Sequence, residues 1–94
     1  MTELSEGIEA FNQGNYELSY TILLPFAENG NPYAQVHIGY FYLKGLHVEI
    51  NQQKAEYWLS KAEASGNSDI EKMIGLIDKE LEIATFAELN RGFG

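Results

Sequence analysis

The chain holds 94 residues, which suits a single domain, because domains commonly contain about 100–200 residues. It has no cysteine, so disulfides, cysteine-ligated metals and thiol nucleophiles are excluded. Fourteen acidic residues against six basic ones give a net charge of −8. This charge argues against nucleic acids and anionic membranes as partners, because both require basic patches on the protein.

Apolar residues recur at spacings of three and four along the chain, a pattern typical of amphipathic helices rather than strands. We therefore predict an all-α fold with about five helices. Their expected ranges are residues 3–13, 16–29, 32–44, 52–65 and 68–90, with a break of the last helix near Ile83 as an alternative. Pro25 lies inside the second helix and should kink it or shorten its final turn, because proline cannot donate a backbone hydrogen bond.

Residues typical of helix ends mark these boundaries. Asparagine side chains can accept a hydrogen bond from a backbone N–H of the first turn, and such N-caps are expected at Asn15, Asn31 and Asn51. Ser68 followed by Glu71 fits a capping box at the start of the last helix. Glycine readily adopts the left-handed conformation of a C-terminal cap, and glycines follow the first four helices at Gly14, Gly30, Gly45 and Gly66.

The helices also repeat with a period of 36 residues. A shift of that length places Asn15 on Asn51, Leu23 on Leu59, Gly30 on Gly66, Asn31 on Asn67, Ile38 on Ile74 and Gly39 on Gly75. Two helices per unit at this period are typical of a helical-pair solenoid, an α-α superhelix in which stacked units share one core. The glycines at positions 39 and 75 should let a neighbouring helix approach closely.

Three segments carry a family resemblance. Ala34 to Tyr42 resembles the first helix of a Sel-one-like repeat, with the pattern A-x-x-x-L-G-x-x-Y, and Gly45 to Val48 resembles its G-x-G-V turn. Lys54 to Ala62 resembles its second helix, with the pattern K-A-x-x-W-Y-x-K-A. The resemblance covers residues 7–79 and departs from the pattern at His47 and Leu59, among other positions.

The resemblance implies one domain over residues 1–94, built as a short tetratricopeptide-like superhelix. Residues 1–30 would form an N-terminal helix pair, 31–66 a complete repeat, and 67–94 a partial repeat with a C-terminal cap. In such a solenoid the first helix of each pair lines the concave face. The residues expected on that face, as a partner-binding surface, are Tyr33, His37, Tyr40, Lys44, Asp69, Met73 and Glu80. Alternatively, Tyr40 and Leu76 only pack between adjacent first helices.

Signals for catalysis are weak. His37 and His47 are ten residues apart and lack a metal-ligand spacing, and the serines lack the motif of a hydrolase nucleophile. The glycines mark helix ends rather than a phosphate-binding loop. We therefore predict no catalytic residues, no metal and no cofactor.

The predicted function is that of a non-enzymatic interaction module, a small acidic adaptor that binds a protein or peptide on its concave face. No lysine or arginine precedes Lys44, so the first 43 residues carry a charge of −5 that suits a basic partner. One alternative is an immunity protein that neutralises a basic bacterial toxin, and a second is a β-lactam-binding or hydrolysing enzyme, as some relatives of the family are described.

Two further expectations concern assembly and location. Apolar side chains at Phe86, Leu89 and Phe93 could pair two copies of the chain through the C-terminal helix. The first ten residues hold three glutamates and no basic residue, unlike a secretory signal, and no apolar run approaches the ~20 residues of a membrane span. These features favour a cytoplasmic protein.

Overall fold

The computed structural model describes the backbone of residues 3–91 and the side chains of residues 3–79, and this part of the chain is all-helical without strands. Its helices are α1 (Leu4–Asn12), α2 (Tyr16–Glu28), α3 (Pro32–Lys44), α4 (Gln52–Glu63) and α5 (Ser68–Arg91). The five predicted helices are confirmed, with each end within two residues of its expected place. Helix α5 is continuous, so the alternative break near Ile83 is wrong.

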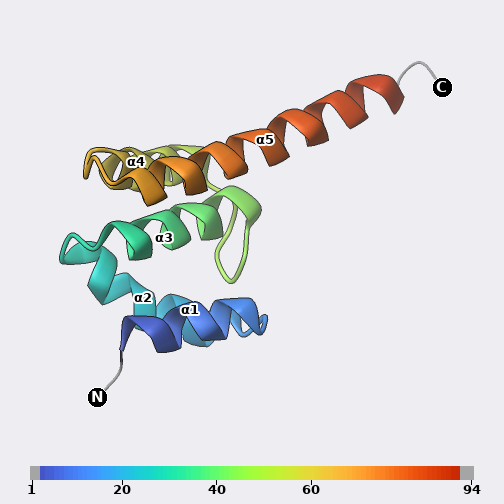
Figure 1. Ribbon diagram of the computed structural model, residues 1–94. Helices are drawn as coiled ribbons and strands as arrows, with labels where there is room; N and C mark the ends of the chain where they lie inside the picture. Colours follow the sequence, from blue (N-terminus) through green and yellow to red (C-terminus); the bar gives the residue numbers. More distant parts are fainter. Residues whose placement is uncertain (1–2, 92–94) are drawn as a thin grey trace.

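The helices alternate in direction along the chain. Figure 1 shows α1, α3 and α5 running in the same general direction, with α2 and α4 returning between them. Helix α3 lies in the middle and packs against α2, α4 and α5, whereas α1 packs chiefly against α2. Helices α1, α3 and α5 lie on a common side of the molecule.

Asparagine side chains cap the helices at equivalent places. Three of them accept a hydrogen bond from the backbone N–H three residues further on, at 3.3, 3.1 and 3.0 Å: Asn15, Asn31 and Asn51. At the start of α5 the cap is Asn67, whose Oδ1 accepts from the backbone N–H of Asp69 at 2.8 Å. The predicted capping box of Ser68 and Glu71 is therefore wrong, because the N-cap lies one residue earlier. Asn67 is also the residue that the 36-residue shift makes equivalent to Asn31.

Two glycines let paired helices approach closely. A Cβ built on Gly39 would lie 2.8 Å from Cγ of Leu59, and one built on Gly7 would lie 2.7 Å from Cγ of Leu23. Both distances are shorter than real carbon contacts, so only glycine fits between α3 and α4 and between α1 and α2. The same expectation for Gly75 is wrong, because no described atom lies within 4 Å of its Cβ position.

Two details fix α2. The hydroxyl of Ser19 donates to the backbone carbonyl of Gly7 at 2.7 Å, and this buried bond joins α2 to α1. Helix α2 also continues through Pro25 to Glu28, where the N–H of Asn29 donates to the Pro25 carbonyl at 3.0 Å. The expectation that Pro25 shortens the final turn is therefore wrong.

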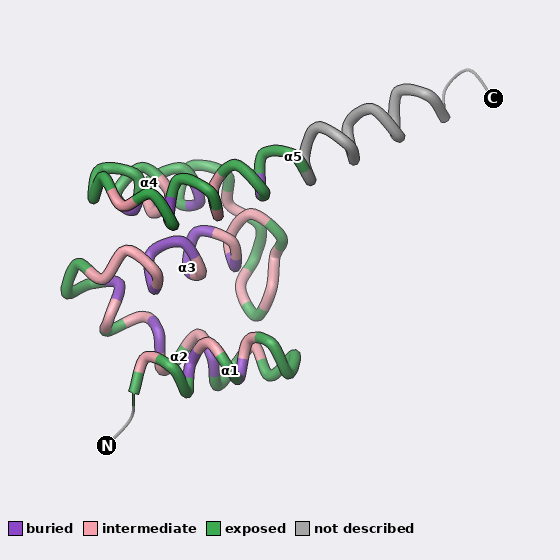
Figure 2. Tube along the Cα trace, in the orientation of Figure 1, coloured by how far each residue is buried: buried purple, intermediate pink, exposed green. Residues whose placement is uncertain are grey.

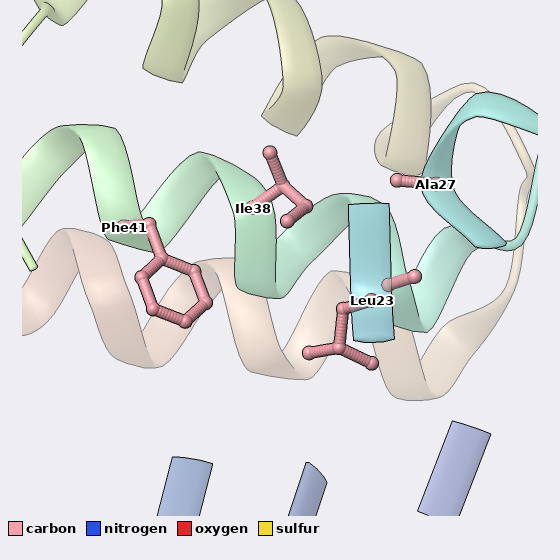
Figure 3. Close-up of a cluster of buried hydrophobic side chains, with 5 residues drawn as sticks. Leu23, Ala27, Ile38 and Phe41 are labelled. Carbon is pink, nitrogen blue, oxygen red and sulfur yellow. The ribbon is translucent and has the colours of Figure 1, made fainter. Parts of the chain in front are cut away.

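The core lies around α3. Figure 2 shows that buried positions are concentrated on this helix, and Figure 3 shows fully buried side chains of α2, Leu23 and Ala27, and of α3, Ile38 and Phe41. The ring of Phe41 meets those of Phe11, Tyr16 and Tyr20 edge-on, at centroid distances of 5.7, 6.1 and 5.5 Å. A second cluster joins α3, α4 and α5 through Val36, Ala62, Ile70 and Ile77. Helix α3 is thus held on several sides, which makes it a rigid base for a site.

Candidate functional site

A hollow of about 360 Å³ opens on the side of the molecule that α1, α3 and α5 share. Among the residues whose side chains the structure describes, eight line it: Phe11, Tyr16, Val36, His37, Tyr40, Met73, Leu76 and Ile77. We call this hollow the groove. The wall that these described side chains form is mostly apolar, and the polar groups among them are one imidazole ring and two phenol hydroxyls. Ligand sites commonly combine an apolar wall with a few polar groups that fix orientation.

The sequence brings these side chains together through helix periodicity. His37 and Tyr40 are three residues apart on α3, and Met73 and Leu76 are three residues apart on α5, so each pair shares one helix face. Phe11 comes from the last turn of α1 and its ring meets that of His37 edge-on, with centroids 5.1 Å apart. Ile38 and Phe41, which follow these two residues on α3, are fully buried.

The structure brings together most of the residues predicted for the concave face. His37, Tyr40 and Met73 line the groove itself. At the N-terminal end of α3, the hydroxyl of Tyr33 donates to Oδ2 of Asp69 at 3.4 Å. At the other end of α3, Nζ of Lys44 lies 5.9 Å from the ring centroid of Tyr40. Glu80, the seventh predicted residue, lies outside the described side chains.

The alternative, that Tyr40 and Leu76 merely pack between first helices, fits only one of them. The ring of Tyr40 is half-buried and lies 5.8 Å from that of Phe11, so it does pack between α1 and α3. Leu76 remains 65% exposed. A leucine this exposed beside an apolar hollow offers a surface to a ligand rather than to the core.

Four lining residues were named in the sequence prediction neither as site residues nor in its packing alternative: Phe11, Tyr16, Val36 and Ile77. The 36-residue shift does not reach α1, because the loop between α1 and α2 is four residues shorter than the loop between α3 and α4. Gly7 and Gly39, which make equivalent contacts with Leu23 and Leu59, are instead 32 residues apart. This shorter spacing is the sequence signal that would have placed α1 beside α3.

Burial of the His37 imidazole favours its neutral form. Burial lowers its pKa below the ordinary value of 6.5, although a hydrogen bond with the backbone carbonyl of Tyr33, at 2.8 Å from Nδ1, acts in the opposite direction. The groove therefore presents an uncharged ring among apolar and phenolic side chains. Such a surface suits an apolar or aromatic group of a ligand.

A second polar cluster lies outside the groove. The hydroxyls of Tyr20 and Tyr42 are 2.9 Å apart, and burial, followed by the hydrogen bond with Tyr42, raises the pKa of Tyr20 to about 12. The ring of His47 lies 5.4 Å from that of Tyr20, and Nζ of Lys54 lies 5.3 Å from the ring of Tyr42. A phenol that ionises this reluctantly is a poor base or nucleophile at neutral pH, so the cluster is best understood as part of the packing between α2 and α3.

Within residues 3–79 no three histidine or carboxylate side chains are grouped so that they could hold a metal ion. In the described part of the chain, none of the helices combines the length and hydropathy that a membrane crossing requires. No family model matches this chain, and none of the curated proteins or solved structures gives a match.

Proposed function

We propose that this chain is a short helical-repeat module of the Sel-one-like type, and that it acts as a non-enzymatic adaptor that binds a peptide segment in the groove. The repeat is supported by helix starts that lie 36 residues apart, at Tyr16 and Gln52 and at Pro32 and Ser68. It is also supported by the matching contacts of Gly7 with Leu23 and of Gly39 with Leu59.

The observation that carries the binding role is the open apolar groove with Leu76 exposed at its side. Peptide-binding surfaces commonly combine aromatic and methionine side chains at the centre with a polar rim. Here Phe11, Tyr40 and Met73 line the groove, and Asp69 and Lys44 lie toward opposite ends of the α3 face. The module therefore has both an anchor pocket and charges that can orient a peptide.

The charge of the molecule indicates a basic partner. Helices α1 and α2 supply Phe11 and Tyr16 to the groove. The charged residues of these two helices, and the residue that precedes α1, are all acidic: Glu3, Glu6, Glu9, Glu17 and Glu28. All five are exposed. A peptide with lysine or arginine beside an apolar anchor would gain long-range attraction, which raises the rate of association more than it changes the final affinity.

The test is selection of peptides from a random library displayed on phage, followed by calorimetry with the purified chain. Selected peptides should share an apolar anchor and a net positive charge. Leu76→Asp should weaken their binding at least ten-fold, because it places a charge beside the apolar wall. Leu18→Asp is the matched control, since Leu18 is also exposed, at 48%, but does not line the groove. Binding unchanged by Leu76→Asp would refute the groove as the site.

The exposed glutamates favour a second candidate, an inhibitor of a basic protein such as a toxin. This binding would depend on the acidic surface of α1 rather than on the groove. The double variant Glu6→Lys/Glu9→Lys should then slow association strongly, with a steep loss of rate as salt increases, whereas Leu76→Asp should have little effect. A loss of affinity in Leu76→Asp supports the adaptor and excludes an inhibitor that bypasses the groove, because slower association in the double variant is expected for any basic partner.

A further inference from the structure

The ring of His37 has a defined protonation pattern. Its Nδ1 lies 2.8 Å from the backbone carbonyl oxygen of Tyr33, and a carbonyl oxygen can only accept a hydrogen bond. Nδ1 therefore carries the proton. A neutral imidazole has one N–H, so Nε2 holds a lone pair and is an acceptor. The backbone of α3 thus fixes which ring nitrogen can accept a hydrogen bond from a ligand.

The surroundings of this ring select the kind of group that could donate to it. Phe11 from α1 meets the ring edge-on, Tyr16 from α2 and Tyr40 from α3 add further aromatic rings, and α5 contributes Met73. Among the described lining residues none is a carboxylate, a lysine or an arginine. These surroundings favour a ligand group that is aromatic or apolar and also carries a hydrogen-bond donor.

We propose that His37 makes the groove selective for a tryptophan side chain of the partner, whose indole N–H donates to Nε2. This inference rests on the proposed function of the groove. Tryptophan fits because its indole is a donor only and its ring can meet the aromatic wall edge-on. The hollow, at about 360 Å³, lies near the small end of the range for ligand pockets, roughly 300–1,000 Å³, and so suits one bulky side chain. The acidic surface of α1 and α2 favours basic residues next to that tryptophan.

The test uses two methylated indoles of equal size as probes. 3-Methylindole keeps the ring N–H, and 1-methylindole replaces its hydrogen with a methyl group. Both are titrated at pH 7.5 into the isotopically labelled chain, and binding is followed by the NMR shifts of groove residues such as Phe11 and Met73. We expect 3-methylindole to bind roughly two- to ten-fold more tightly, the range that one net hydrogen bond supplies. The comparison needs no variant, so it does not depend on whether a substituted chain folds.

His37→Leu supplies the second measurement, because it removes the acceptor and keeps an apolar side chain. In this variant the two probes should bind with equal affinity. If the original chain already binds them equally, the groove accepts apolar rings but His37 does not select for tryptophan, and the inference is overturned while the proposed function stands. If neither probe shifts groove residues at its solubility limit, both the inference and the groove as an anchor site are overturned. If the preference persists in His37→Leu, it arises from shape and the role of His37 is wrong.

Discussion

The two equivalent glycines provide a sharp test of how closely α3 and α4 pack. Gly39 and Gly75 lie 36 residues apart, each inside a helix, at the same place in consecutive first helices. A Cβ at Gly39 would meet Cγ of Leu59 at 2.8 Å and the backbone oxygen of Ala55 at 3.3 Å, whereas no described atom lies within 4 Å of a Cβ at Gly75. We therefore propose to compare Gly39→Ala with Gly75→Ala.

The structure sets the size of the difference. Replacing glycine by alanine inside a helix stabilises it by about 1 kcal/mol, and this gain is common to both variants. Gly75→Ala should show the gain in full, as a rise in Tm of about 4–8 °C for a domain of this size. At Gly39 the added methyl group overpacks the contact with α4, at a cost of about 1–3 kcal/mol. The common gain cancels, so the free energies of unfolding should differ by about 1–3 kcal/mol, with Gly39→Ala the less stable.

Urea unfolding followed by circular dichroism at 222 nm measures this difference. With an m-value of about 1–2 kcal/mol/M, the two midpoints should be separated by about 0.5–3 M. Both variants start from the same amino acid and end in the same one, so changes in the unfolded chain largely cancel. Equal midpoints for the two variants would refute the close approach of α3 and α4. A lower midpoint for Gly75→Ala than for the original chain would show that its helix face is covered.

Three further outcomes are expected. Ser19→Ala removes the buried bond to the Gly7 carbonyl and should lower the free energy of unfolding by about 1 kcal/mol in urea titrations, and an unchanged midpoint would contradict that bond. Because burial lowers the pKa of His37, the unfolded chain binds a proton on this residue more readily than the folded chain does. The free energy of unfolding should therefore keep its full value above about pH 6.5 and decrease below it. His37→Gln should reduce the loss in urea midpoint between pH 7.5 and pH 5.5. Tyr42→Phe should lower the pKa of Tyr20 from about 12 without restoring its ordinary value, since burial is the larger cause. Absorbance at 295 nm as a function of pH would detect this change in the pKa.

The helices could be predicted from the sequence because their signals are local. A helix N-cap needs only one asparagine and the backbone of the next turn. The sequence therefore suffices to predict the N-caps at Asn15, Asn31 and Asn51. At the start of α5, two candidate caps stand side by side, and the local pattern favoured Ser68 over Asn67. The repeat would have decided correctly, because Asn67 falls at the position equivalent to Asn31.

The groove could be predicted only in part, since it is formed by helices distant in the sequence. His37 and Met73 were placed on one face by the period of 36 residues, and both line the groove. Phe11 was missed because the shorter loop after α1 moves that helix out of register with this period. The exposure of Gly75 was missed for a different reason. The sequence shows that Gly75 is equivalent to Gly39, but it does not show whether a helix packs against Gly75 as α4 packs against Gly39.

The central place of α3 has a consequence for how the chain folds. Each helix pair with substantial contacts is adjacent or next but one along the chain, so little loop-closure entropy opposes their formation. Proteins dominated by such local contacts fold in microseconds to milliseconds. Helix α5 packs least extensively against the other helices, so we expect α1 to α4 to form first and α5 to dock afterwards. The groove, which needs residues from α1 and α5 at once, is then completed only in the last step of folding.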